Sequence, residues 1–569
     1  METLFQWWLL APEITVAATG ILALALDLLL PERLKPSLRR IPSLGLLLAA
    51  GLSIWLACNA GGEGDHAGAP GFAKTFQTSG GINTFFILAA LAAVWLGGRF
   101  FKRNGLPVAE FHFLIPVVAA ALMLLQGSRH FILFFTALEA STTGLCVLAA
   151  YNRRSGTSLE AGLKYLLAAG ISGSLLLLGI VLLHGVAGNP VLNALDGTPA
   201  QDALYFDVLQ TFVAAHPTHP LVLVGAALVT AGVAFKIGLA PFQQWVPDVY
   251  QGAPSPVTAF FATASKLAGI LALHLLLSGP FSALVRINDG KPGPLLVLLG
   301  IMIALTFAFS TLTALGQSNT KRLMGLSGLS HAAFLALVVL VLATHPTQHI
   351  WNCAMVSLCL YAFAYLAAST TIFAVMGEVA TAGGETGLAA ILKTDMAEDA
   401  DAGQRTTDFQ LLRERQPFLC GALCTGLASL AGIPPTAGFF AKLLVLGTSI
   451  GCGIAIGPGT PAATFFWALS GVALLAACGG VYYYFAWMRE AFQRHWIPEE
   501  RRERFAASPL NPSVGTRLAL IALSVAILLL GLLPAFLCAS SAPPDFPKNA
   551  PRSSSHAHPL PTDPAPPPA

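Results

Sequence analysis

The sequence predicts an all-α polytopic membrane protein with about 14 transmembrane helices. Three observations predict this class. Hydrophobic residues make up 55% of the 569 residues and charged residues only 10%, whereas soluble domains carry about 25% charged residues. The apolar residues gather in runs of about 20, the length at which a helix crosses a bilayer. Lysine and arginine concentrate in every second loop between these runs.

Fourteen runs reach this length. The first contains Glu13 and Asp27 but has no basic leading segment and no small-residue cleavage site, so we interpret it as a spanning helix and not as a signal peptide. The predicted helices cover approximately residues 8–30, 42–60, 80–100, 109–127, 130–150, 161–186, 220–240, 256–279, 294–315, 323–343, 350–377, 416–448, 462–488 and 514–538.

The loop charges predict the orientation of the chain. Loops after odd-numbered helices, with Arg517 at the start of the last helix included, hold 21 of the 31 lysines and arginines, whereas loops after even-numbered helices and the C-terminal tail together hold 6. Because cytoplasmic loops carry the excess of Lys and Arg, we expect both termini on the periplasmic side of a bacterial inner membrane.

Composition and motifs exclude several classes of function. The net charge of +3 is small, and no basic run is interleaved with aromatics, so we expect no nucleic-acid partner. The nine cysteines form no CxxC motif and no Cys/His cluster with the spacing of metal ligands. No glycine-rich nucleotide-binding loop is present. We therefore expect no metal and no cofactor on this chain.

Two predicted helices are interrupted, and each carries a lysine. In the seventh, Gly238 and Pro241 follow Lys236; in the twelfth, Gly432 and a Pro-Pro pair precede Lys442. A cation at membrane depth is costly and is therefore a functional candidate, and broken helices at that depth are typical of ion transporters. The two breaks lie five helices apart, so we predict that helices 4–8 and helices 9–13 form two internal repeats.

Lys236 and Lys266, in the seventh and eighth helices, have no acidic residue at helical spacing. Burial disfavours the charged form of an amine, so a buried lysine can exchange a proton near neutral pH. We predict that both lysines carry protons. The alternative is a structural lysine held by the backbone carbonyls that a helix break exposes.

Three further polar side chains in the membrane are candidates. Glu139 lies near the middle of the fifth helix, where it acts in proton transfer or makes a structural hydrogen bond while protonated. Lys164 either forms an interfacial pair with Glu160, one turn earlier, or faces inward and pairs with Glu139. His331, in the tenth helix, is a possible relay between the two lysine sites because histidine titrates near neutrality; the alternative is a hydrogen-bonded core histidine.

Four stretches of the sequence carry a resemblance to a known family. They read "LEASTTGLCVLAAYNRRSGTSLEAGLKYLLAAGISGSLLLLG", "FKIGLAPFQQWVPDVYQGAPSPVTAFFATASK", "SNTKRLMGLSGLSH" and "LAGIPPTAGFFAK". They resemble the antiporter-like proton-pumping subunits of respiratory complex I, the NADH–quinone oxidoreductase, and the resemblance covers roughly residues 8–538. The start "LLAPEI", the fourteen helices and the lack of a long lateral C-terminal helix favour the shorter type of these subunits.

This resemblance implies two inverted five-helix repeats with broken helices 7 and 12, and a hydrated row of charged residues along the membrane plane. It also implies that protons move outward, driven by quinone reduction in a neighbouring subunit. NADH, FMN, the iron–sulfur clusters and quinone would then be bound by other subunits, and the partners of the chain would be those subunits and membrane lipids. The residues that match the proton channel of the family are Glu139, Lys164, Lys236, Lys266 and Lys442.

We expect the following division of the chain. Residues 1–108 hold helices 1–3, residues 109–280 the first repeat and residues 281–490 the second repeat. Within the second repeat, residues 378–415 are acidic and rich in Gly and Ala, which predicts a flexible cytoplasmic loop. Residues 491–539 hold helix 14, and the Pro-rich residues 540–569 should be disordered.

The sequence also departs from the family. Gln243 and Gln251 stand where relatives usually have His and Glu, and Leu326 and Ala333 replace a usual Tyr and Gly. Glutamine cannot titrate, so a proton relay through position 243 would need a hydrogen-bonded water. Two alternative functions remain: a subunit of a multisubunit cation/proton antiporter, and a structural subunit whose channel has lapsed. The buried charges argue against the second, because charges without a task are costly in a membrane.

Overall fold

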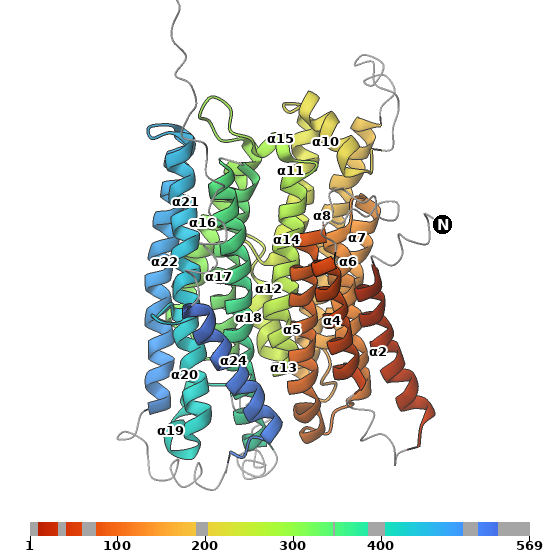
Figure 1. Cartoon of the computed structure of the whole chain (residues 1–569), viewed down its shortest axis with the longest axis vertical. Coiled ribbons are helices and arrows are strands. Elements are labelled where there is room, and N and C mark those ends of the chain that lie inside the picture. Colours follow the sequence, from red (N-terminus) through yellow and green to blue (C-terminus); the bar gives the residue numbers. More distant parts are fainter. Residues whose placement is uncertain are drawn as a thin grey trace, which may run out of the picture.

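The computed structural model describes residues 10–31, 41–59, 76–188, 203–344, 347–384, 404–492 and 510–532. Across these ranges the regular structure is helical, without a β-strand beyond isolated bridges. The long helices stand side by side in one bundle (Figure 1). Thirteen helices of the described part are long and apolar enough to cross a membrane. The shorter apolar segment Ile41–Leu56 corresponds to the predicted second helix, so the predicted all-α membrane fold is confirmed.

The first part of the chain supplies the helices drawn in red to yellow-green in Figure 1. They are α2 (Ala11–Leu29), α4 (Ile41–Asn59), α5 (Phe76–Arg103), α6 (Ala109–Gly127), α7 (Phe131–Ala149), α8 (Gly156–Ala187), α11 (Pro220–Ile237), α12 (Trp245–Gly252), α13 (Ser255–Phe260), a π-helical turn (Phe261–Ser265) and α14 (Lys266–Ser278).

The second part of the chain supplies the green to blue helices. They are α16 (Pro294–Leu315), α17 (Thr320–Thr344), α18 (Gln348–Gly384), α20 (Pro417–Ala431), α21 (Ala437–Ile456), α22 (Pro461–Phe492) and α24 (Val514–Leu532). Short helices α10 (Phe206–Ala215) and α15 (Ser282–Val285) lie at one end of the bundle, and α19 (Leu412–Arg415) lies at the other (Figure 1).

Some boundaries differ from those predicted. Helix α18 continues to Gly384, and the 3₁₀ turn Thr406–Phe409 and α19 lie at the end of the segment predicted as a flexible loop. The segment is therefore helical at both ends, where hydropathy alone indicated a loop. Helix α10 was not predicted, because its ten residues are too few to register as a span. The tail 540–569, the rest of the loop and both chain termini lie outside the described residues.

The two predicted breaks have the same local geometry. Gly238 ends α11 with φ +86° and Gly432 ends α20 with φ +83°, a left-handed conformation that glycine adopts without steric cost. At both sites the N–H groups of the glycine and of the next residue donate to the carbonyl four residues before the glycine, Ala234 or Ala428. This is the Schellman pattern of helix termination. A cis peptide bond precedes the proline three residues after each glycine.

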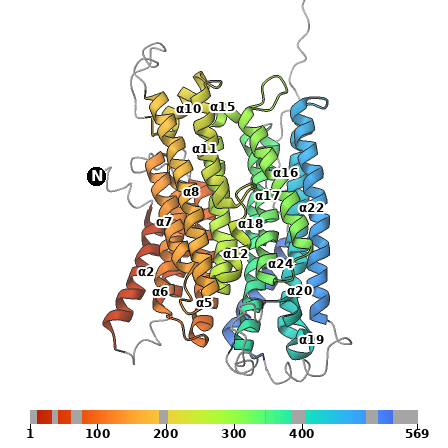
Figure 2. The ribbon, with the colours of Figure 1, turned by 180° about the vertical axis from the view of Figure 1, so that it is seen from behind.

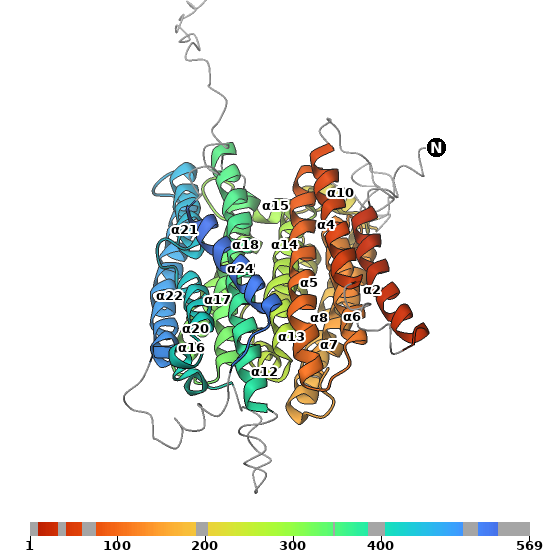
Figure 3. The same ribbon diagram turned by 60° about the horizontal axis from the view of Figure 1, so that its bottom comes forward.

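The most buried helices lie where the two parts of the chain meet. Helix α17 is buried along nearly its whole length, as are α13 and α14. Helix α24 crosses α18 and α21 obliquely on one face (Figures 1 and 3). Helices α8, α11, α16 and α22 form the opposite face (Figure 2). The central helices, shielded from lipid, carry Lys266 and His331, so the fold itself places these groups in the interior.

Candidate functional site

Lys236 lies at the last turn of α11, just before the break, and is 3% exposed. Its ammonium donates to the hydroxyl of Thr142 at 2.8 Å and to those of Ser141 and Tyr165 at 3.4 Å each. These hydroxyls come from α7 and α8, so three helices hold one amine. The amine is not held by backbone carbonyls, which excludes the alternative predicted for this lysine. Hydroxyls both donate and accept, so they can solvate the amine in either protonation state.

Glu139 lies on α7, the helix that also carries two of the three hydroxyls that hold Lys236. The charges of Glu139 and Lys236 interact through space. The buried Oε1 atom of Glu139 has no hydrogen-bond partner among the described residues. It faces Gly173 of α8, where a Cβ atom would come within 2.7 Å of it. A structural hydrogen bond at Oε1 is therefore not found in the described part of the chain.

Lys164 pairs with two carboxylates, and neither is Glu139. Its ammonium lies 2.6 Å from Asp248 Oδ2 and 2.8 Å from Glu160 Oε1, and its side chain is 42% exposed. Of the two predicted arrangements, the interfacial pair with Glu160 is present and the inward pair with Glu139 is not. Asp248, on α12 directly after the break, was missed because it lies 84 residues from Lys164.

Asp248 joins the two parts of the chain. Besides Lys164 of α8, it accepts a hydrogen bond of 2.6 Å from Arg322 at the start of α17. Arg322 also donates to Gln251 at 2.8 Å. Partial burial raises the pKa of Asp248, but hydrogen bonds from Lys164 and Arg322 and their charges outweigh burial, so the pKa lies below its usual value of 3.8. Asp248 is therefore an ionised bridge between two cations.

Lys266 is the first residue of α14, directly after the π-helical turn, and is 3% exposed. Its Nζ atom makes no hydrogen bond to any described residue and lies 5.2 Å from the ring centre of Tyr250. Gly328 of α17 faces the amine, and a Cβ atom there would lie 2.4 Å from Nζ. π-Helical turns occur often at functional sites, and here the turn places an amine with an aromatic ring as its neighbour.

Lys442 and His331 face one small cavity in the second part of the chain. Lys442 of α21 donates to the carbonyls of Leu430 at 2.7 Å and Ala431 at 3.1 Å, which the break at Gly432 leaves without helical partners. His331 lines the same cavity of about 10 Å³, roughly the space that one water requires. A lysine held by backbone carbonyls at a helix break was the alternative for Lys236 and Lys266. This arrangement is found at Lys442 instead.

His331 makes two hydrogen bonds, with Tyr361 OH at 2.7 Å and with Tyr484 OH at 3.1 Å. Tyr484 OH bonds in turn to Ser327. The charges of Lys266 and Lys442 both act on the imidazole. His331 is thus both a hydrogen-bonded core residue and a group between two lysines, so the two predicted interpretations do not exclude each other.

These residues are distributed over both parts of the chain and the helices between them. Glu139 and Lys236 belong to the first part of the chain and Lys442 to the second, while Lys266 and His331 lie on the central helices between them. Lys164 stands apart, at the partly exposed Asp248 bridge. Gln243 is buried, and its Oε1 has no partner among the described residues. In the described part of the chain, no three His, Cys, Asp or Glu side chains are arranged to hold a metal ion.

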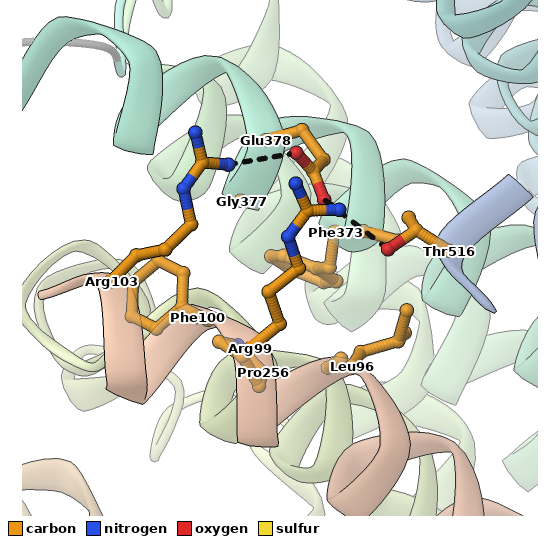
Figure 4. A pocket seen from close by; sticks show the side chains of 11 residues that line it. Leu96, Arg99, Phe100, Arg103, Pro256, Phe373, Gly377, Glu378 and Thr516 are labelled. Atoms are coloured by element: carbon orange, nitrogen blue, oxygen red, sulfur yellow. Dashed lines mark hydrogen bonds and ion pairs between the residues drawn. The ribbon is translucent and has the colours of Figure 1, made fainter. Parts of the chain in front are cut away.

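A second charged cluster lies where α5, α18 and α24 meet (Figure 4). Glu378 of α18 is 3.2 Å from Arg103 and 3.6 Å from Arg99, both on α5. Thr516 of α24 donates to the same carboxylate at 3.3 Å. One carboxylate therefore joins three helices from distant parts of the chain.

Comparisons with known proteins identify a matching family and relatives of this chain. The family described as the transmembrane part of NADH:quinone oxidoreductase and Mrp antiporters matches residues 128–465. NADH-quinone oxidoreductase subunit N 1 of Opitutus terrae is 37% identical over 92% of this chain and 94% of its own length. Subunit N 2 of Syntrophobacter fumaroxidans is 32% identical over 79% of this chain and 84% of its own length.

Chains similar to this one are also found among solved structures. A chain of respiratory complex I from Thermus thermophilus with bound aureothin is similar with a TM-score of 0.67 and 26% identity, covering 93% of this chain and 99% of that one. A chain of the Mrp complex from Dietzia is similar with a TM-score of 0.69 at 17% identity, covering 95% and 96%. The second likeness concerns the fold alone.

Proposed function

The chain belongs to the NADH:quinone oxidoreductase/Mrp antiporter family of membrane proteins, and we propose that it is subunit N of an NADH–quinone oxidoreductase. In this role it conducts protons across the membrane while other subunits transfer electrons from NADH to quinone. The relatives named subunit N support the assignment, because the one from Opitutus terrae matches 92% of this chain and the one from Syntrophobacter fumaroxidans 79%.

One observation carries the proton-conducting role. Lys236, Lys266 and Lys442 are all buried in membrane helices, and not one of them lies within ion-pair distance of a described carboxylate. Hydroxyls, an aromatic ring and carbonyls surround them instead. An unpaired buried cation is costly, so these lysines are suited to lose and regain a proton, which a permanently paired lysine is not.

The roles of individual residues follow from this geometry. Glu139 biases the protonation of Lys236 through space, and His331 with its two tyrosines relays protons between Lys266 and Lys442. Lys164 acts at the partly exposed bridge with Asp248. The two matching breaks at Gly238 and Gly432 support the division into repeats of residues 109–280 and 281–490.

The setting of the chain is part of the proposal. The basic loops lie in the cytoplasm of a bacterium, and both termini face the periplasm. NADH, FMN, the iron–sulfur clusters and quinone are bound by other subunits, and this chain carries no redox centre. Its hydroxyl-lined and carbonyl-lined lysines supply a proton path only.

The test compares membranes that contain the wild-type chain, Lys236→Ala and, as a matched control, Lys291→Ala. Lys291 is exposed in a loop outside the membrane helices. NADH-driven quinone reduction and the proton gradient are measured side by side. We expect Lys236→Ala to assemble but to lose most of both activities, because proton transfer and electron transfer are coupled, and Lys291→Ala to retain both.

Two results would contradict the proposal. If Lys236→Ala retains both NADH oxidation and the gradient, Lys236 is not on the proton path. If, in addition, sodium-driven proton exchange collapses in this variant, the chain acts in a cation/proton antiporter of the kind that the Mrp likeness represents.

A further inference from the structure

A cavity of about 590 Å³ lies beside the central helix α14, and no lysine lines it. Its walls come from the start of α5, the end of α6, the length of α14 and the first half of α18. Most of its lining is apolar, with Phe85, Met123, Leu271, Met355 and Phe363 among the contributing side chains. The volume falls in the range of about 300–1,000 Å³ that holds organic ligands.

The cavity reaches the outside of the chain. Cys359 lines it from α18, a membrane-spanning helix, and is exposed. Along α14 the lining runs from Leu267 to Ser278, a rise of about 16 Å at 1.5 Å per residue. This is about half of a hydrocarbon core roughly 30 Å thick. The cavity therefore spans the depth of one leaflet.

One end of the cavity carries a cation without a partner. Arg129, just after α6, makes no hydrogen bond or ion pair through its guanidinium with any described residue. The indole of Trp351, near the start of α18, lines the same cavity, but its Nε1 atom is fully buried and is not open to a ligand. The nearby amides are already engaged, because Gln126 donates to Asn83 at 2.7 Å and Asn83 donates to Glu13 at 3.1 Å.

The size and shape favour one occupant. Water alone would leave most of the apolar wall without contacts, since one water fills about 30 Å³. A helix about 10 Å in diameter and 16 Å long would need more than twice the volume. An acyl chain is narrow, apolar and as long as one leaflet is deep. A phosphodiester at its polar end would accept hydrogen bonds from the guanidinium of Arg129.

We propose that this cavity binds a glycerophospholipid of the leaflet on the side of Arg129. One acyl chain lies between α14 and α18, and the phosphodiester is bound by Arg129. The lipid fills the space between the first helices of the chain and α18. It thereby supports α14, whose first residue is Lys266. The loop charges place this leaflet on the periplasmic side.

The test uses the purified complex that contains the full chain. It is washed in mild detergent and reconstituted with phosphatidylglycerol carrying a photoactivatable diazirine on one acyl chain. After illumination, labelled peptides are identified by mass spectrometry. We expect labels on α14 and on the first half of α18. Leu271→Trp, which fills the cavity, and Arg129→Gln, which removes the cation, should each lower this labelling about tenfold.

The matched control is Arg286→Gln, which removes an exposed arginine just after α15 that does not line the cavity. It should label like the wild type. The proposal is wrong if α14 is not labelled in the wild type, or if Leu271→Trp and Arg129→Gln both label fully. It is also wrong if Arg286→Gln loses as much label as Arg129→Gln, which would indicate a general effect of surface charge. Thermal unfolding of each variant verifies that the fold is retained.

Discussion

At the scale of single residues, the environment of each buried lysine differs in what it can stabilise. Carbonyl oxygens accept hydrogen bonds but cannot donate them, so the ligands of Lys442 favour the charged ammonium, which is a stronger donor than the neutral amine. The hydroxyls around Lys236 can rotate to accept from a charged ammonium or to donate to a neutral amine. Lys266 has only the ring of Tyr250 close to it, which attracts a cation modestly. The three lysines therefore lie in chemically different surroundings, although the sequence gives no sign of this difference.

Asp248 gives a prediction about pH at this scale. A carboxyl whose pKa is lower in the folded chain than in the unfolded chain stabilises the fold above its unfolded pKa, and this stabilisation is lost as the pH falls through the folded pKa. Its partners are partly exposed, so we expect Asp248→Asn to cost about 1–2 kcal/mol at neutral pH. The difference in melting temperature between wild type and variant should stay constant from about pH 8 to 5 and vanish below the folded pKa, which lies under 3.8.

The control for this measurement is Asp207→Asn, an exposed acid on α10 outside the bridge. It should leave the melting temperature nearly unchanged at every pH. A difference between wild type and Asp248→Asn that grows as the pH falls would show that the carboxylate is not held between Lys164 and Arg322 as the structure has it.

At the scale of elements, the two helix breaks are what turn apolar runs into a site. The glycine that ends α20 frees the carbonyls that hold Lys442, and the one that ends α11 stops the helix just after Lys236. The π-helical turn does the same for Lys266 by changing the direction of the side chains that follow it. Each lysine is therefore presented by an interruption of its helix or of the helix beside it.

Gly238→Ala tests the first break. Left-handed backbone costs a residue with a Cβ atom about 1–2 kcal/mol, and the new methyl would also lie 2.7 Å from Leu329 Cδ2. We expect a lower melting temperature and slower proton pumping, because α11 would end differently and move Lys236. Gly447→Ala, in the middle of α21 with no atom within 4 Å of the added Cβ, should not lower the melting temperature. Equal stability of both variants would contradict the role of the break.

At the scale of the whole molecule, local signals predicted the spans and both breaks, because hydropathy, glycine and proline act on neighbouring residues. The pairing of Lys164 with Asp248 escaped prediction because the two residues are 84 positions apart. The same holds for Glu378 and Arg103, which are 275 positions apart. The position of the π-helical turn was also missed, since "FATAS" carries no breaker. The sequence thus predicts which groups are buried, and the fold decides which of them meet.

The Glu378 cluster predicts how α24 is held against α5 and α18. Glu378→Gln keeps the shape of the side chain but removes the negative charge that pairs with both Arg99 and Arg103 (Figure 4). Both arginines are about one third exposed, so we expect a loss of about 1–3 kcal/mol. Helix α24 should loosen, because Thr516 bonds to the same carboxylate. Hydrogen–deuterium exchange in α24 should therefore quicken in Glu378→Gln and change less in Thr516→Val, which removes one hydroxyl only. Unchanged exchange in Glu378→Gln would show that apolar packing alone holds α24 to α18 and α21.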